Sequence, residues 1–574
     1  MPDKRILEQL MTMLRGLRAQ VRLFDEEGES LSGTESEIIP EFPQLGMAVV
    51  RDGWTWLHTM TPAIPYLCVE GEDGAAEDCA RLAAALAESM MREPSTTTRD
   101  DVLRGALRED MPEPELVTLA EEYGVRERTP GKRFREKLRD LTGACVVRDA
   151  SKCILCGKCV RVCEEVQKVS AIGFVGRAGR TVVAPAFHQS MNVSSCVGCG
   201  QCTLVCPTGA LVEHSSLDSV TAAVGDPEKC VVIQHSPAVV LAVAEEFGLK
   251  PGMDVPGLLN AALRRIGFRK VFNSAFAADI AIQEQSKELV ERLKSGANLP
   301  LIAACSSAVP FIEEFYPEFI PNLSTVRSAQ GILASLIRTH FAKAEGIPPD
   351  RIFCVAAAPC TARKSEAAHA VPGGEAALDA VLTSRELLRL IRLYGIDFNS
   401  LIPEPADTPF AVRSTAGKLA DVSGGTAEAI LRTTHRLLSG RELKSMKIES
   451  VRGLDPLKET TIRVGDTEIG VVVVSGLGTA RRVLDLIRSG VMRDVKLLEI
   501  HACPGGCIAG GGQPFGAAPE KIKARMQALY SIDQSEHLRT AHSNPDVRAL
   551  LETVSAPESA ELFHTVYAPR DVIV

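Results

Sequence analysis

The chain has 574 residues, of which 45% are hydrophobic, and its 64 Lys plus Arg against 73 Asp plus Glu give a net charge of −9. A chain of this length exceeds a single hydrophobic core, so about three or four domains are expected. The acidic balance, without a basic block, argues against a nucleic-acid partner. No run of about eighteen apolar residues is present, so no membrane span is expected.

Residues 1–140 contain few cysteines and histidines that could bind a metal. The first twenty or so, MPDKRILEQLMTMLRGLRAQ, lack the apolar core of a signal peptide, so a cytoplasmic location is expected, although a subunit exported with a partner would begin the same way. Cys68 and Cys79 are the only cysteines here, and no histidine or cysteine lies between Met90 and Gly143. Two cysteines are too few for a 2Fe–2S site, so buried structural thiols are expected.

Residues 141–225 contain a duplicated cysteine motif. Each copy has the spacing C-x₂-C-x₂-C-x₃-C, by which bacterial two-cluster ferredoxins bind 4Fe–4S clusters. The copies are CILCGKCVRVC, with Cys153, Cys156, Cys159 and Cys163, and CVGCGQCTLVCP, with Cys196, Cys199, Cys202 and Cys206. Zinc is the alternative, but zinc sites usually carry two separated C-x₂-C pairs. The motif predicts an α+β ferredoxin domain with two 4Fe–4S clusters.

The motif also predicts how the cysteines are shared, because the fourth cysteine of each run ligates the other cluster. One cluster is expected on Cys153, Cys156, Cys159 and Cys206, and the other on Cys196, Cys199, Cys202 and Cys163. Gly157, Gly198 and Gly200 are expected to let backbone amides approach the sulfurs. Two such clusters carry electrons and perform no catalysis by themselves.

Residues 226–574 have an α/β pattern. Buried-strand candidates such as PLIAACS, RIFCVAAAP and VKLLEIHAC alternate with amphipathic helices such as SKELVERLKSG. Three of the strands end close to Cys305, Cys360 and Cys503. Because ligand sites in open α/β sheets lie beyond the carboxyl ends of the strands, these cysteines are predicted to converge on one buried site.

Two motifs give this region a family resemblance. Together with the ferredoxin motif, APCTARKSE and EIHACPGGCIAGGGQP are similar to the second and third signature motifs of the iron-only (FeFe) hydrogenases. The resemblance implies an α/β domain of two lobes, each a parallel sheet with helices. It also implies an H-cluster, which is a 4Fe–4S cubane joined to a two-iron subsite carrying CO, cyanide and azadithiolate. The implied ligands are Cys305, Cys360, Cys503 and the bridging Cys507.

The resemblance implies further residues around this cofactor. Those expected to bind it are Pro359, Lys364, Gly506, Gly511 and Gln513. The glycines of the third motif are expected to leave room for a bulky organometallic group, where a Cβ would intrude. The alternative is a glycine-rich loop with a structural C-x₃-C. Residues 1–140 resemble the α/β accessory domain of larger family members without its metal ligands.

The proton path departs from the family pattern. The first family motif, Thr-Ser-Cys-Cys-Pro-x-Trp, is replaced by IAACSSAVPF, which puts Ala304 at the cysteine that relays protons. Gln285 stands where the family has a relay glutamate, and neither side chain titrates near neutral pH. Ser324 and Glu288 fit the outer relay positions. The resemblance therefore implies an interrupted path.

Other substitutions surround the implied two-iron subsite. Arg363 takes the place of a lysine that hydrogen-bonds a cyanide ligand, and Glu366 ends the same motif. Ala358 replaces a methionine. His501 replaces another methionine, near the bridging CO, and is either a satisfied core residue or a replacement proton donor.

Three functions are compatible with these residues. The preferred one is a hydrogenase-type protein that interconverts H₂ with protons and electrons slowly and has a sensory or regulatory role. The second is an active hydrogenase whose proton path is rerouted through His501. The third is a hydrogenase-related iron–sulfur protein without the two-iron subsite, acting in cluster assembly. In the first case, a redox partner protein or partner hydrogenase subunits would receive the electrons or the signal.

Overall fold

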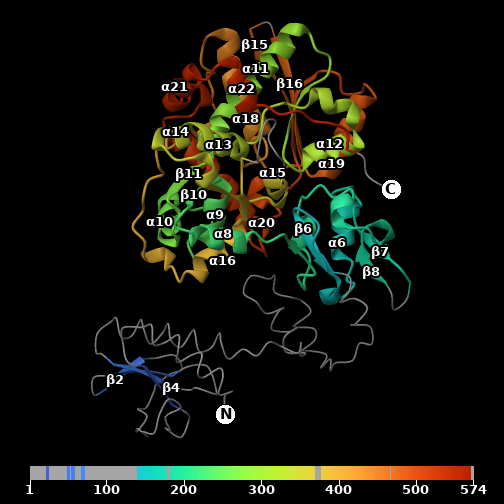
Figure 1. Ribbon diagram of the computed structural model, residues 1–574. Helices are drawn as coiled ribbons and strands as arrows, with labels where there is room; N and C mark the ends of the chain where they lie inside the picture. Colours follow the sequence, from blue (N-terminus) through green and yellow to red (C-terminus); the bar gives the residue numbers. More distant parts are fainter. Residues whose placement is uncertain are drawn as a thin grey trace. The chain divides into compact units, whose positions relative to one another are not determined.

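The computed structural model describes residues 139–177, 181–368, 377–465 and 467–570, with the backbone of four earlier strands (Figure 1). The chain divides into two compact units, Met1–Arg104 and Gly105–Val574. In the first unit the strands pair antiparallel in the order β1-β4-β3-β2, and they are β1 (Val21–Phe24), β2 (Ala48–Arg51), β3 (Trp54–His58) and β4 (Tyr66–Glu70). The rest of the predicted accessory domain, including the side chains of Cys68 and Cys79, lies outside the described residues.

The ferredoxin module opens the described part of the second unit. It contains an antiparallel sheet of β5 (Arg139–Asp140), β6 (Val146–Asp149) and β9 (Leu211–Glu213). A separate hairpin consists of β7 (Gly173–Val175) and β8 (Val182–Ala184). One-turn helices α6 (Lys158–Arg161) and α7 (Gln201–Leu204) occupy equivalent places in the two motifs. Each begins after a glycine with positive φ, Gly157 at 76° and Gly200 at 68°, a conformation that favours glycine.

The first sheet of the larger domain is entirely parallel, in the order β11-β10-β13-β14. Its strands are β10 (Cys230–His235), β11 (Lys270–Asn273), β13 (Ile352–Ala358) and β14 (Ala380–Thr383). Successive residues of β10 and β13 enter two different hydrophobic clusters, so both faces are covered. The covering helices are α9 (Pro237–Glu246), α10 (Pro256–Ile266) and α16 (Ser384–Leu393) on one face, and α11 (Ala275–Ser295) and α13 (Ala329–Leu336) on the other.

The second sheet has the order β12-β17-β16-β15 and is parallel except at one edge, where β15 pairs antiparallel with β16. Its strands are β12 (Leu301–Ala304), β15 (Leu457–Val464), β16 (Thr467–Ser475) and β17 (Val495–His501). It is covered by α12 (Ala308–Phe315) and α19 (Leu477–Arg488) on one face and by α11 and α18 (Gly425–Ser439) on the other. The predicted two-lobed fold is confirmed, with the antiparallel edge strand as an addition.

Helix α11 joins the two lobes. Phe276 and Ile280 belong to the core of the first sheet, whereas Ile282 and Leu289 belong to the core of the second. A single helix of 21 residues thereby fixes both sheets relative to each other. The remaining helices are α8 (Leu217–Val224), α14 (Ala342–Glu345), α15 (Ser365–Ala368), α17 (Thr415–Leu419), α20 (Pro519–Ser535), α21 (Pro545–Thr553) and α22 (Ala556–Phe563).

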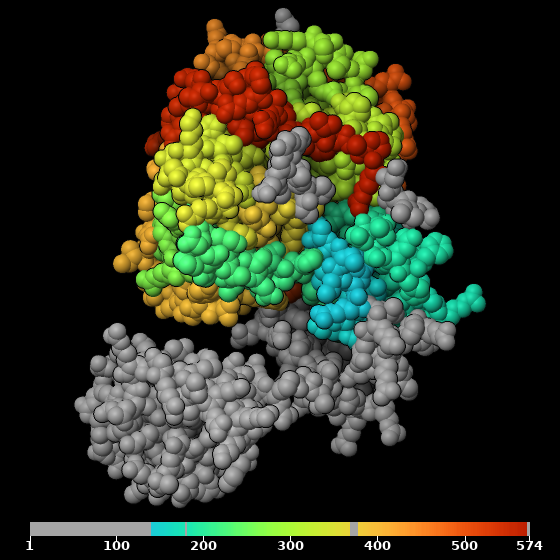
Figure 2. Space-filling model, in the orientation of Figure 1, coloured from blue at the N-terminus to red at the C-terminus, as the bar shows by residue number. Residues whose placement is uncertain are grey.

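The segment after α22 returns to the ferredoxin module. Figure 2 shows it in red, running down toward the module, in cyan to teal. Arg570 donates hydrogen bonds to the carbonyls of Cys196 and Ser194, over 3.1 and 3.3 Å. Among the described residues, none of the helices combines the length and the hydrophobicity needed to cross a lipid bilayer.

Candidate metal-cluster site

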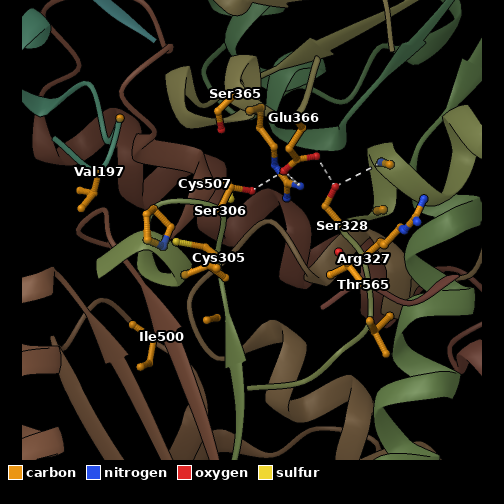
Figure 3. Close-up of a pocket in the computed structure, with 18 of the residues that line it drawn as sticks. Val197, Cys305, Ser306, Arg327, Ser328, Ser365, Glu366, Ile500, Cys507 and Thr565 are labelled. Carbon is orange, nitrogen blue, oxygen red and sulfur yellow. Dashed lines mark hydrogen bonds and ion pairs between the residues drawn. The ribbon is translucent and has the colours of Figure 1, made fainter. Parts of the chain in front are cut away.

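A cavity of about 880 Å³ lies where the carboxyl ends of the two sheets meet. Its wall includes Ser274 after β11, Ala304 and Cys305 at the end of β12, and His501 at the end of β17. Cys507, from the loop after β17, also lines it (Figure 3). The site therefore lies at the sheet edge that the sequence predicted.

The structure brings the four predicted cubane ligands together. Cys305 follows β12 directly, Cys360 and Cys503 lie two residues beyond β13 and β17, and Cys507 begins a short 3₁₀ helix. Burial raises the pKa of Cys503 and of Cys507 well above the ordinary range, and neighbouring thiols raise both further. Such thiols become thiolates only beside a strong positive charge, which an iron–sulfur cluster supplies. All cysteines in the described part of the chain are free of disulfides.

Cys507 faces charged groups of both signs. The carboxylate of Asp421 raises the pKa of this thiol, and the guanidinium of Arg363 lowers it. Asp421, Arg363 and Cys507 all line the cavity, and Asp421 accepts a hydrogen bond from the amide of Ala238 over 2.8 Å. The cavity beside Cys507 thus has the volume and the polar wall needed by a bulky group attached to its sulfur.

The glycines of the third motif have a packing role that the sequence did not indicate. A Cβ on Gly506 would lie 2.6 Å from the amide nitrogen of Ser423, one on Gly510 would lie 2.2 Å from the carbonyl of Pro359, and one on Gly511 would lie 2.1 Å from the carbonyl of Cys199. These glycines let the loop pack against other backbone segments. The space for a cofactor is the cavity itself.

Other predicted cofactor-binding residues support the loop from outside the cavity. Pro359 accepts a hydrogen bond from Gly512 over 2.8 Å, and the buried amide of Gln513 donates to the carbonyl of Ala238 over 3.1 Å. Lys364 forms a buried ion pair with Glu386 at 2.8 Å and donates to the carbonyl of Val381. Lys364 does not line the cavity, and its charge is compensated by Glu386.

Arg363 and Glu366 lie together on the cavity wall. They form an ion pair of 3.0 Å, and the side chain of Arg363 is 22% exposed. Burial by itself lowers the pKa of Arg363, but Glu366 and the nearby thiols raise it by more. Arg363 is therefore a fixed cation, and it faces the sulfur of Cys507.

The predicted proton path is divided into an outer and an inner half. In the outer half, Ser324 donates a hydrogen bond of 2.6 Å to Glu288, and Thr325 donates to the same carboxylate. In the inner half, Ala304 and Gln285 both line the cavity. The structure thus places both replaced relay residues beside the space where the implied cofactor would lie.

His501 lines the cavity and binds a buried glutamate. Its Nε2 lies 2.8 Å from Oε1 of Glu499, whose carboxylate also accepts the amides of Gly424 and Ala427 at the start of α18. Burial raises the pKa of Glu499, but His501 and these two amides lower it by more. His501 is therefore held by an anionic partner and is both well packed and adjacent to the cavity.

The eight ferredoxin cysteines form the two predicted groups of four. One small cavity is lined by Cys153, Cys156, Cys159 and Cys206, and another by Cys163, Cys196, Cys199 and Cys202. Backbone amides approach the sulfurs, as in the hydrogen bond of 3.4 Å from Leu155 to Cys153. The crossed grouping suits two cubane clusters, and ligation itself stays a prediction.

Polar contacts join the second ferredoxin group to the larger domain. The side-chain amide of Gln201 donates to the sulfur of Cys503 over 3.2 Å, and Thr361, next to Cys360, donates to the carbonyl of Gly198 over 2.6 Å. Sequence analysis did not identify Gln201, Asp421, Glu499, Ser306 or Ser328. Only the positions of Gln201 inside the motif and of Ser306 beside Cys305 could have indicated a role.

Family models match most of the described chain. Residues 229–511 match the iron only hydrogenase large subunit, C-terminal domain, residues 519–570 match the iron hydrogenase small subunit, and residues 152–210 match a 4Fe-4S dicluster domain. Helices α20, α21 and α22 thus belong to a region resembling a small subunit, fused here to the large one. Sequence analysis did not separate this region.

Relatives of several kinds share the fold. The NADP-reducing hydrogenase subunit HndD of Solidesulfovibrio fructosivorans is 38% identical over 79% of this chain and 80% of its own length. A structure of the FeFe-hydrogenase HydA1 from Chlamydomonas reinhardtii has a TM-score of 0.56 and 31% identity, covering 62% of this chain and 99% of that one. Cytosolic iron-sulfur assembly component 3 of Mus musculus is 28% identical over 61% of this chain and 77% of its own length.

Proposed function

Because this chain belongs to the iron-only hydrogenase family, we propose that it binds an H-cluster and interconverts H₂ with protons and electrons at a low rate. Two 4Fe–4S clusters in the ferredoxin module carry the electrons. The observation that carries the proposal is the proximity of Cys503 to Cys305, Cys360 and Cys507, beside a cavity that Cys305, Cys507 and residues of that module line.

The residues around the cavity have different chemical roles. Cys305, Cys360, Cys503 and Cys507 would hold the cubane, and Cys507 would also hold the two-iron subsite, which when bound supplies the metal centre for hydrogen chemistry. The fixed cation of Arg363 orients and compensates anionic ligands in the cavity. Gln201 and Thr361 join the second ferredoxin motif to the segments that carry Cys503 and Cys360, which would give electrons a short path between the clusters.

Low turnover follows from the inner proton path. Every turnover requires proton transfer at the subsite, and a relay group must lie within about 3 Å or one water of its acceptor. Ala304 and Gln285 on the cavity wall cannot ionise near neutral pH. A hydrogenase that binds hydrogen and changes redox state without fast turnover is suited to a sensory or regulatory subunit in the cytoplasm.

Partner subunits would receive the electrons. HndD is described as a subunit of an NADP-reducing hydrogenase, which supports a multi-subunit assembly for this chain as well. Electrons would leave for such a partner near Cys156, because it is the exposed cysteine of the first ferredoxin group.

A role in cluster assembly is the second candidate. The likeness to cytosolic iron-sulfur assembly component 3 favours it. The cavity beside Cys507 and Arg363 has room for a bulky group on the thiol, which favours a two-iron subsite instead.

Infrared spectroscopy of the matured protein separates these candidates. The hydrogenase proposal expects CO and cyanide stretching bands that change under H₂. Matured protein with full ferredoxin clusters and no such bands would support the assembly role and contradict the hydrogenase role.

A further inference from the structure

Ser306, Glu366 and Ser328 form a continuous hydrogen-bonded chain on the cavity wall (Figure 3). Oγ of Ser306 donates to Oε1 of Glu366 over 2.6 Å, and Oγ of Ser328 donates to Oε2 over 2.5 Å. The two hydroxyls therefore bind different oxygens of one carboxylate. A proton can enter at one oxygen and leave from the other.

This hydrogen-bonded chain connects the interior of the cavity to the wall that the C-terminal segment lines. Ser306 directly follows Cys305 at the end of β12, which is the inner end. Ser328 caps the N-terminus of α13 and lies beside Arg327 and Thr565 on the wall formed with the C-terminal segment. The side chain of Glu366, between them, is 24% exposed, so water can reach it.

We propose that Ser306, Glu366 and Ser328 move protons between solvent and the cavity, in place of the route interrupted at Ala304 and Gln285. The inference rests on the proposed function. In the inward direction, Ser328 passes its hydroxyl proton to Oε2 of Glu366 and takes one from water. After the carboxyl group rotates, it gives that proton to Oγ of Ser306, which releases its own hydroxyl proton to a water in the cavity. No electron moves, and each serine ends neutral.

A positioning role for Glu366 is the competing explanation. Its carboxylate also accepts hydrogen bonds of 3.0 Å from Arg363 and from Gln330, so it could serve only to orient Arg363. Such a role does not require a transferable proton on Ser306. The serine hydroxyls therefore distinguish proton transfer from positioning.

The test compares Ser306→Ala and Glu366→Gln with Ser365→Ala in the matured full chain. Ser365 is a matched control on the same wall, because its hydroxyl donates to the backbone carbonyl of Ala362 over 2.7 Å. Hydrogen evolution should fall roughly tenfold or more in the first two variants, on the scale of a lost proton-transfer group, and stay within about twofold in the control. Ser306→Thr, which keeps the hydroxyl, should restore most of the rate.

An infrared difference spectrum between the H₂-reduced and oxidised states gives a readout independent of turnover. We expect a carboxyl band that shifts in D₂O, is absent in Glu366→Gln and persists in Ser365→Ala. Unchanged CO and cyanide bands would show that the variants retain the subsite. Should Ser306→Ala lose these bands, Ser328→Ala tests the same chain from its outer end.

The outcomes separate the inference from the proposed function. Normal turnover in Ser306→Ala or Ser328→Ala with intact CO bands would overturn the relay alone. A wild-type protein without CO bands would overturn the proposed function, and the relay with it.

Discussion

The side-chain amide of Gln201 lies 3.2 Å from the sulfur of Cys503 and donates a hydrogen bond to it. Gln201 stands between two predicted ligands of the ferredoxin module, Cys199 and Cys202, whereas Cys503 is a predicted ligand of the H-cluster cubane. One residue therefore links the second ferredoxin motif to a predicted ligand of the other cubane. Hydrogen bonds to cluster sulfurs stabilise the reduced, more negative state and raise the reduction potential.

Removing this hydrogen bond should lower the potential of the H-cluster cubane. For Gln201→Met we expect a decrease on the order of 50 mV, from about 1 kcal/mol for the bond and 59 mV per tenfold change for one electron. An infrared-monitored redox titration measures it. Gln167→Met is the matched control, because Gln167 crosses the same boundary but donates to the carbonyl of Ala502 over 3.0 Å. Equal potentials in Gln201→Met and wild type would contradict the prediction.

Cys507→Ala should remove the two-iron subsite while both ferredoxin clusters stay reducible. Its thiolate is the only proposed protein bond to the subsite, and the ferredoxin clusters have eight cysteines of their own. Matured wild type should hold about fourteen iron atoms per chain, from three cubanes and one two-iron subsite. Iron analysis, infrared and electron paramagnetic resonance spectroscopy measure these contents. CO bands retained in the variant would show that the bridge lies elsewhere.

Restoring the family residues at positions 304 and 285 together should raise hydrogen evolution by more than the two single changes added. Ala304→Cys alone should raise hydrogen evolution modestly, because Gln285 still interrupts the next step. Ala304→Cys combined with Gln285→Glu should exceed the sum of the two single changes, since links in series are non-additive. Assays with a low-potential dye compare wild type, both singles and the double. Wild-type activity in the range of ordinary hydrogenases would argue against an interrupted path, and His501→Met would then test the rerouted one.

The ion pair between Glu213 and Arg385 should stabilise the docking of the ferredoxin module. Glu213 lies on β9, Arg385 on α16, and they approach to 2.7 Å with side chains 4% and 2% exposed. Arg385 also donates to the carbonyl of Gln513 over 2.7 Å. Glu213→Gln leaves this guanidinium buried without its counter-charge, so we expect a loss of about 3 kcal/mol in the free energy of unfolding. Urea unfolding of the cluster-free chain at pH 7 measures it.

The same pair gives a pH dependence with a defined sign. Burial raises the pKa of Glu213, but Arg385 lowers it by more, to about 2 from an ordinary 4.5. The stabilisation is therefore complete above pH 4.5 and decreases as the pH falls toward 2. Wild type should lose more stability than Glu213→Gln between pH 5 and about 3. Parallel losses in the two proteins would show that Glu213 does not titrate in this window.

The sequence by itself determined the grouping of the ferredoxin cysteines and the fold class. Cysteine spacing fixes which thiols can surround a cubane, because three ligands within seven residues must share one cluster, and the structure groups Cys163 and Cys206 in the crossed manner expected. Apolar runs ending at Cys305 and Cys503 were sufficient to predict buried parallel strands, because such strands are covered on both faces.

Only the tertiary structure decided what surrounds the cavity. The packing contact of Gly511 could not be predicted from sequence, because the atom that excludes its Cβ is the carbonyl of Cys199, more than three hundred residues away. Ser306, Ser328 and Glu366 come from three separate segments, and no spacing rule connects them before the chain folds. Hydrogen bonds between distant side chains depend on orientations that packing sets, whereas spacing within a motif is set by the covalent chain.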